Sequence, residues 1–259
     1  MSDTDLQRAD AEIERLRQAL ETETERCIAA QRQSERAVAE VEEFISMAAH
    51  NLRESLRDVA LSAQLMAETC AGGLDPGAGA FLERIRERAA GMQSLLTGVV
   101  DYWAIGAGRR EFSRTDMQAV LDRALLSLDE RIAQRCAIVN CDPLPAVMGD
   151  SDTLTKVLVH LIRNAIEYCD APSPRVHVAC RRGDPDWVFS VQDNGPGIEP
   201  AFRDRIFAAF RRLHGREYPG NGLGLAFCKR AVEWHGGRMW MEPAPAPGST
   251  LCFTLPAAE

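Results

Sequence analysis

The sequence predicts an α+β protein in which a long helical hairpin precedes a layered α/β domain. Three observations predict it: a heptad pattern at the beginning of the chain, a glycine- and proline-rich break at residues 71–77, and short alternating helix and strand patterns beyond residue 110. The chain has 259 residues, of which 46% are hydrophobic and 26% charged, so it can bury a core and wholesale disorder is excluded.

The first predicted helix is unusually long. Up to Ala48 the chain contains no glycine or proline. Almost all positions at alternating steps of three and four residues from Leu6 to Ala48 are apolar or small, which is the heptad pattern of a coiled coil. A single amphipathic helix lying on a core is the alternative. From Phe44 to Leu56 the pattern takes three successive steps of four, a stutter that locally unwinds a coiled coil.

A second helix is predicted over residues 80–105, and its apolar side chains share one face. They are Phe81, Ile85, Ala89, Met92, Leu95 or Leu96, and Val99. Two long helices joined by a short loop form a helical hairpin, which alone has too little core. We therefore expect two copies to pair into a four-helix bundle, so that the protein is a homodimer.

Beyond the linker at residues 106–110 the elements become short. Helices are predicted at 116–135, at 150–169 and from after Gly222 to Glu233, and strands at 137–140, 175–181, 187–192, 238–242 and 250–255. This mixture predicts an α+β layered domain with helices packed on a sheet.

Three motifs in this domain carry chemistry. Residues 193–198 read Asp-Asn-Gly-Pro-Gly-Ile after a strand, residues 220–225 read Gly-Asn-Gly-Leu-Gly-Leu before a helix, and Asn164 lies on the helix upstream. Glycines let backbone approach a ligand, and a glycine-rich helix start can cradle phosphate. Taken singly, the first motif could be a simple turn, the second is a weak signal, and Asn164 could be a solvated side chain.

In this order and spacing the motifs resemble the ATP-binding domain of sensor histidine kinases, the GHKL or Bergerat-type α/β sandwich shared with gyrase. The resemblance covers about residues 35–256. Asn164 matches the N box, and residues 206–214 resemble the phenylalanine box between the two glycine boxes. Residues 218–230 and 235–238 look most like kinases of phytochromes and related photoreceptors.

The resemblance implies that the domain binds ATP and Mg²⁺. Asn164 would coordinate the metal, Asp193 would accept a hydrogen bond from the adenine amino group, and residues 199–220 would form a mobile lid. Arg212 would reach the γ-phosphate, unless it is only a solvated arginine. The nucleotide-binding candidates are Asn164, Tyr168, Asp193, Gly195, Gly197, Arg212, Gly220, Gly222, Leu223 and Gly224.

His50 is the candidate phosphoacceptor. Its surroundings resemble the family's H box, again in the phytochrome-like version. His50 lies two residues from Ala48 and from Leu52, about 200° around the helix from each, so it should point away from the apolar stripe into solvent. Taken alone, this residue would be interpreted as an ordinary surface histidine on a helix. With Asn51, it forms the candidate catalytic pair.

The chain departs from the family pattern at several positions. Asn51 replaces the usual carboxylate that can accept the imidazole proton, and Ser55 replaces a helix-bending proline. Glu167 stands where the family often has a cation near the phosphates, so we expect it to add repulsion. His160 replaces the first asparagine of the N box, and Glu54 replaces a Thr or Asn, which predicts weak phosphatase activity.

The resemblance predicts autophosphorylation of His50 and transfer to an aspartate on a response-regulator receiver domain. The alternative is a degenerate kinase that works as a dimeric scaffold with weak or no nucleotide turnover. A conformational ATPase of the gyrase type is disfavoured, because His160 occupies the nearest turn where such enzymes need a carboxylate base.

Composition limits the partners and the compartment. A net charge of −8 argues against a nucleic-acid partner, and no apolar run reaches the roughly 18 residues of a membrane segment. The eight cysteines include no CxxC pair, which fits a reduced cytoplasmic protein without a zinc site.

The expected domains are a coiled-coil signalling helix at 1–45, a dimerisation and phosphotransfer domain at 46–109 and a catalytic ATP-binding domain at 110–259. This division leaves no room for a sensor, so input would come from a partner, from the coil or from a missing N-terminal domain. The stimulus, the cognate regulator, the choice between cis and trans transfer and whether the chain is full length stay open.

Overall fold

A computed structural model describes residues 3–69, 75–106, 112–211, 221–242 and 248–258. The chain divides into two compact units, Met1–Ala48 and Ala49–Glu259, and each is described by itself. In these described parts, every helix is too short or too polar to cross a bilayer.

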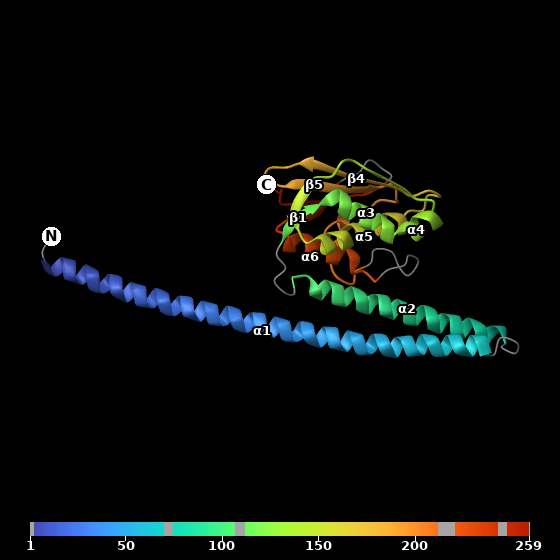
Figure 1. Cartoon of the computed structure of the whole chain (residues 1–259), viewed down its shortest axis with the longest axis horizontal. Helices are drawn as coiled ribbons and strands as arrows, with labels where there is room; N and C mark the ends of the chain where they lie inside the picture. Colours follow the sequence, from blue (N-terminus) through green and yellow to red (C-terminus); the bar gives the residue numbers. More distant parts are fainter. Residues whose placement is uncertain (1–2, 70–74, 107–111, 212–220, 243–247, 259) are drawn as a thin grey trace. The chain divides into compact units, whose positions relative to one another are not determined.

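Helix α1 runs from Asp3 to Thr69 (Figure 1). Within the first unit most of its described apolar side chains, including Leu16, Leu20, Val41 and Phe44, are exposed. An exposed apolar stripe on a lone helix needs a partner surface, so coiled-coil pairing remains our prediction for this unit.

In the second unit, the remainder of α1 lies beside α2, Pro76–Ala104 (Figure 1). Helix α2 begins four residues earlier than predicted, with Pro76 in its first turn. Proline suits that position, because the first amides of a helix have no intrahelical partner. The breaker residues 70–74 lie outside the described residues.

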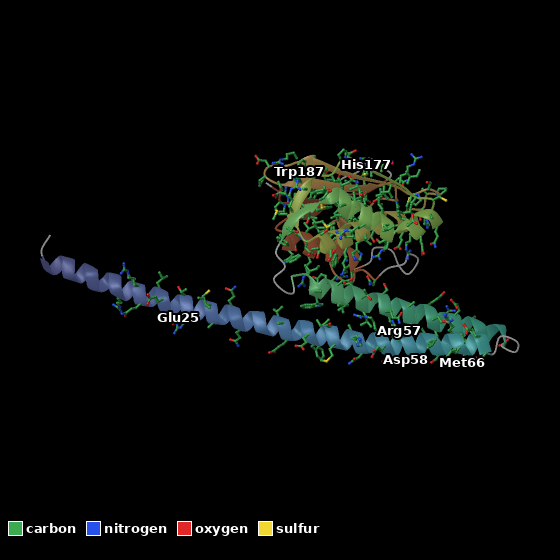
Figure 2. The ribbon with its side chains drawn as sticks, viewed as in Figure 1. Glu25, Arg57, Asp58, Met66, His177 and Trp187 are labelled. Atoms are coloured by element: carbon green, nitrogen blue, oxygen red, sulfur yellow. The ribbon has the colours of Figure 1, made fainter. Side chains whose placement is uncertain are left out.

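The apolar stripe predicted for this part of α1 is in fact two faces. Small residues, Ala49 and Ala63 of α1 and Ala89 of α2, are buried, so they allow the two helices to approach closely. Leu52, Val59 and Met66 are 52%, 48% and 57% exposed (Figure 2 labels Met66). The sequence pattern had therefore placed in one stripe two sets of residues that the structure separates. One set is buried between α1 and α2, and the other lies on a second face that is exposed.

The α/β domain has two sheets. Strand β1, Ser113–Asp116, pairs antiparallel with β3, Ala146–Gly149. The larger sheet has the order β2-β4-β5-β7-β6, with β2 parallel to β4 and every other pair antiparallel. Its strands are β2 Ile138–Cys141, β4 Arg175–Arg182, β5 Trp187–Asp193, β6 Met239–Glu242 and β7 Thr250–Leu255.

Helices cover one face of the larger sheet (Figure 1). They are α3 Met117–Ser127, α4 Asp129–Gln134, α5 Ser151–Glu167 and α6 Gly224–Trp234, with short 3-10 turns at Pro200–Phe202 and Arg205–Phe207. The core lies between the helices and the sheet. Leu158 and Ile162 of α5 are buried there, together with Phe189 and Phe253 of the sheet. The two phenylalanine rings stack with their centroids 5.1 Å apart. The predicted α+β hairpin-plus-sandwich architecture is confirmed.

The prediction of one helix at about 116–135 is wrong in one respect, because two helices occupy this stretch. The start agrees to within a residue: after strand β1, Asp116 caps α3 by accepting a hydrogen bond from the Gln118 amide at 2.9 Å. The helix breaks at the buried Leu128. The Ser127 hydroxyl donates to the Ala124 carbonyl, and Asp129 starts a new acidic first turn, both of which favour an end and a restart.

Candidate functional site

One cavity of about 440 Å³ gathers most of the nucleotide-binding candidates. It is lined by α5, the loop after β5, the start of α6 and the start of β7. Seven of the ten candidates line it: Asn164, Tyr168, Asp193, Gly197, Gly222, Leu223 and Gly224. Gly195 is buried behind Asp193, whereas Arg212 and Gly220 lie outside the described residues.

Asp193 is fixed by backbone amides at the end of β5. Its Oδ1 accepts hydrogen bonds from the amides of Gly195, at 2.8 Å, and Ser249, at 3.1 Å. Burial raises the pKa of this carboxyl, while the two amides act in the opposite direction. Because Oδ1 is occupied by these donors, Oδ2 is the oxygen best placed to accept from a ligand.

Two glycines let the backbone pass close to Asp193. Gly197 has φ +79°, and a Cβ there would lie 3.1 Å from the Gly248 carbonyl oxygen. At Gly248 a Cβ would lie 2.2 Å from the Asp193 carbonyl oxygen, which backbone cannot accommodate. Gly248 and Ser249 were not predicted as site residues, although a Gly-Ser pair directly before a predicted strand is a usable signal.

Helix α5 supplies the floor of the cavity. Asp150 caps its start by accepting from the Thr153 amide at 2.8 Å, and Asn164 and Tyr168 follow one turn apart at its end. One turn before Asn164, the His160 ring accepts a hydrogen bond at Nδ1 from the Arg163 guanidinium at 2.8 Å. Burial, reinforced by Arg163, lowers the pKa of His160 to about 3, so its imidazole is neutral near pH 7.

Glu167 also lines the cavity, but its charge is paired. Arg131 of α4 donates from Nη1 to Glu167 Oε1 at 2.5 Å. Burial raises the pKa of Glu167, and Arg131 is the largest opposing influence. The sequence predicted simple repulsion of phosphate at this position, and the structure instead shows an ion pair whose cation comes from another helix.

The second glycine box forms a tight turn into α6. Gly222 has φ +72°, and a Cβ there would lie 2.8 Å from the Arg211 carbonyl oxygen. Asn221 stabilises the turn, because its Oδ1 accepts from the Leu223 amide at 3.1 Å. Helix α6 begins at Gly224, so its first amides face the cavity without intrahelical partners.

His50 lies in a different place from these residues. It lines a groove of about 810 Å³ together with Arg53, Glu54 and residues of α2. Its side chain is 64% exposed, as the helical geometry predicted, and Nδ1 lies 3.9 Å from Glu54 Oε2. The neighbouring Ser55, which replaces the family's proline, donates to the Asn51 carbonyl at 3.1 Å within an unbroken helix.

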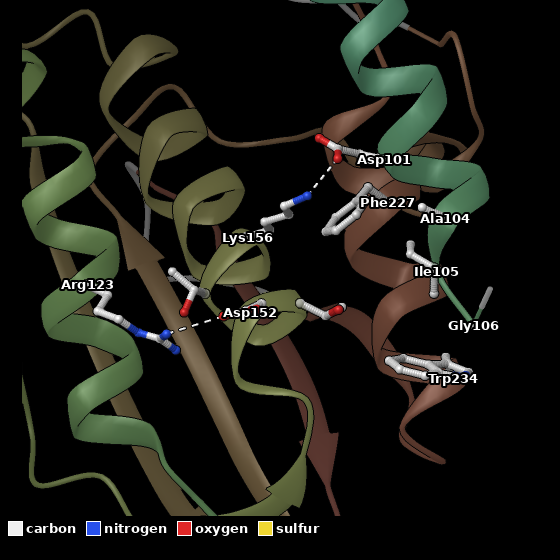
Figure 3. A pocket seen from close by; sticks show the side chains of 11 residues that line it. Asp101, Ala104, Ile105, Gly106, Arg123, Asp152, Lys156, Phe227 and Trp234 are labelled. Atoms are coloured by element: carbon white, nitrogen blue, oxygen red, sulfur yellow. Dashed lines mark hydrogen bonds and ion pairs between the residues drawn. The ribbon is translucent and has the colours of Figure 1, made fainter. Parts of the chain in front are cut away.

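A third cavity, of about 420 Å³, lies where the end of α2 meets α5 and α6 (Figure 3). Lys156 pairs with Asp101 across it, Nζ to Oδ1 at 2.6 Å, and Arg123 pairs with Asp152 at 3.4 Å (Figure 3). Ile105 is buried in the domain core. The Lys156–Asp101 pair and the buried Ile105 fasten the end of α2, whereas the Arg123–Asp152 pair joins α3 to α5, and the cavity contains none of the predicted site residues.

The family model for histidine kinase-, DNA gyrase B-, and HSP90-like ATPases matches residues 149–259, which contain the glycine motifs and Asn164. Together with the fold, this match defines a GHKL-type ATP-binding domain.

Among curated proteins, cyanobacterial phytochrome A of a Nostoc species is 41% identical over 223 residues, covering 86% of this chain and 29% of the phytochrome. The phytochrome-like protein Cph1 of a Synechocystis species is 38% identical over 226 residues, covering 87% of this chain and 30% of that protein. The chain therefore spans less than a third of the length of these two relatives.

Solved structures agree with this result. The mycobacterial sensor histidine kinase MprB is 32% identical, with a TM-score of 0.51, and the match covers 56% of this chain and 97% of that one. Full-length ShkA in complex with AMPPNP has a TM-score of 0.65 at 26% identity, covering 83% of this chain and 46% of ShkA. The chain belongs to the sensor histidine kinase family, as its motifs predicted.

Proposed function

We propose that this chain is the transmitter of a two-component system, which phosphorylates its own His50 with ATP and passes the phosphoryl group to an aspartate of a response-regulator receiver domain. The observation that carries the proposal is the single cavity that combines Asn164, Asp193 and the amide-rich start of α6. The proposed divisions are a signalling coil at 1–45, a dimerisation and phosphotransfer domain at 46–109 and a catalytic domain at 110–259.

The cavity has the donors and acceptors that an adenine nucleotide needs. Asp193 Oδ2 would accept from the adenine amino group, while its Oδ1 stays fixed by Gly195 and Ser249. The first amides of α6 would bind phosphate oxygens, and Arg212 would add a cation from the lid. Asn164 would hold Mg²⁺, which neutralises developing charge on the phosphates when bound.

The reaction consists of two in-line transfers. An imidazole nitrogen of His50 attacks the γ-phosphorus, a P–N bond forms, the bridging P–O bond breaks, and ADP leaves. The ring gives its N–H proton to a carboxylate or to water. A receiver aspartate oxygen then attacks the same phosphorus, the P–N bond breaks, and the imidazole regains a proton.

For transfer within one chain, movement must precede the first step, because His50 and Asp193 line different cavities. Domain motions of this kind gate many phosphoryl transfers. The exposed face of Leu52, Val59 and Met66 supports a homodimer, and the encounter could be within one chain or between two. Input from a partner or from a further N-terminal domain, and a cytoplasmic location, belong to the same proposal.

Incubation with γ-labelled ATP and Mg²⁺ tests this function. Wild type should take up acid-labile, base-stable label, while His50→Ala should bind nucleotide without taking up label. Asp193→Asn should lose both nucleotide affinity and label. A folded wild-type dimer that stays unlabelled would contradict the proposal and would instead indicate a binding scaffold.

A further inference from the structure

The charges around the nucleotide cavity have an unusual arrangement. Three arginines line it, and Arg163 donates to the half-buried His160 while Arg211 stands on the exposed segment before the second glycine box. The third, Arg131, comes from α4, a helix outside the sequence motifs. It meets Glu167, the residue that stands where the family resemblance led us to expect a cation.

The Arg131–Glu167 pair is asymmetric in exposure. The Glu167 side chain is 11% exposed, whereas that of Arg131 is 52% exposed, so the carboxylate lies beneath the guanidinium. A guanidinium carries five N–H donors in a planar fork, and a single carboxylate accepts two of them at most in a bidentate pair. The geometry therefore leaves donors on the open side of Arg131 for a second anion.

Arg131 is also held in position by its helix. One turn further along, Arg135 Nη2 donates to the Cys169 carbonyl at 2.7 Å, which fastens the end of α4 to the chain just after α5. Arg131 within α4 and Arg135 directly after it are thus both tied to the end of α5 that carries Asn164 and Tyr168. A guanidinium held by its ion pair, on a helix whose end is also fixed, loses little freedom when it binds a ligand.

We propose that Arg131, oriented by Glu167, supplies the cation that pairs with the polyphosphate of the bound nucleotide. Arg131 is then a phosphate-binding residue and Glu167 a positioning residue. This inference rests on the proposed function, since it concerns the same cavity. Arg123 offers a matched control, because it also pairs with an α5 carboxylate, that of Asp152, but lines a different cavity (Figure 3).

The test is a calorimetric titration of the full chain with Mg-ATP and with AMP. Arg131→Gln should weaken ATP binding about tenfold or more, which is the loss expected when a charge-assisted hydrogen bond is removed. It should change AMP binding by less than about twofold. Arg123→Gln should leave both affinities unchanged.

Arg131→Gln alone also leaves Glu167 as an unpaired anion that repels phosphate. The double variant Arg131→Gln with Glu167→Gln removes both charges and separates the two effects. ATP binding that stays weak in the double variant would support the inference. Recovery to the wild-type affinity, or an equal loss for ATP and AMP in the single variant, would overturn it and leave the proposed function intact. A folded wild type that binds neither nucleotide would overturn both.

Discussion

At the scale of single residues, the surroundings of His50 contain a carboxylate in an unexpected position. Asn51 follows the histidine where the family has Asp or Glu, and an amide can orient the ring but cannot accept its proton. Glu54 lies one turn further on, with Oε2 3.9 Å from His50 Nδ1. This distance exceeds that of a hydrogen bond, so Glu54 is a less effective acceptor than a carboxylate in contact with the ring.

Asn51→Asp should therefore raise the autophosphorylation rate. A positioned general base contributes roughly 10²–10⁴-fold, and we expect an increase of about tenfold because water and Glu54 already serve in part. Initial rates of label uptake at saturating ATP measure the effect, and Asn51→Ser is the control for loss of the amide. An unchanged or lower rate in Asn51→Asp would show that Asn51 itself is adapted to the reaction.

Two histidines, the buried His235 and the half-buried His160, make the catalytic domain sensitive to acid. His235 Nδ1 hydrogen bonds with the Ala231 carbonyl at 2.7 Å, and its Nε2 accepts from the Asp150 amide at 2.9 Å. Burial lowers the pKa of His235 and, more strongly, that of His160. Both rings must therefore stay neutral in the folded protein, while the unfolded chain protonates them at an ordinary pKa near 6.5.

Stability should consequently fall as the pH falls. Below about pH 6.5 the unfolded state binds more protons, so each of these histidines costs up to about 1.4 kcal/mol of unfolding free energy per pH unit, down to its folded pKa. Urea unfolding between pH 7.5 and pH 5 measures this slope. His160→Gln should reduce this slope. Because the carboxyl groups are the same in both proteins, equal slopes would contradict the inference that His160 stays neutral in the folded protein.

At the scale of elements, the longer regular patterns were predictable, whereas of the four-residue strands β2 and β6 were predicted and β1 and β3 were not. The alternation in β4 and the apolar run of β7 predicted those strands to within a residue, because β4 has one face against the core and β7 is buried along almost its whole length. Strands β1 and β3 were not predicted, because neither contains adjacent β-branched residues such as those in β2 or an aromatic residue such as that in β6, and they form a small sheet by pairing with each other.

The same reasoning applies to the site. Residues within the glycine motifs were predictable because backbone geometry restricts which residue can stand there, as at Gly222. Arg131 and Ser249 were missed because they reach the cavity from segments without a motif. Only the packing of α4 against α5 and the pairing of β7 in the sheet bring them to Asn164 and Asp193.

The uncovered face of the hairpin leads to a prediction about association. Val59→Glu with Met66→Glu should convert the proposed dimer to a monomer, because charges replace apolar side chains that we expect to be buried between copies. Helical content should persist, since both positions are exposed within one chain. Sedimentation velocity measures the change. Arg57→Glu, on the His50 groove (Figure 2), makes the same total change in charge and should leave the dimer intact, and a dimer in both variants would contradict the assignment of this face.

At the scale of the whole molecule, α1 is the one described element that belongs to both compact units. Along a helix each residue advances the chain by about 100° around the axis, so the number of residues between two stretches sets the phase between their faces. The heptad pattern before Ala48 and the exposed face after it are separated by the predicted stutter. The phase between these two stretches is therefore the property through which a signal would reach His50.

Insertions after Ser46 can test this dependence on phase. Two extra alanines turn the following residues by about 200°, whereas seven turn them by nearly two full turns and restore the register to within about 20°. We expect the two-residue insertion to change the autophosphorylation rate severalfold in either direction and the seven-residue insertion to leave it near the wild-type value. Nucleotide affinity serves as the control, because the cavity around Asp193 is untouched. Rates that decline steadily with insertion length, irrespective of phase, would show that α1 acts as a tether and not as a rotational coupling.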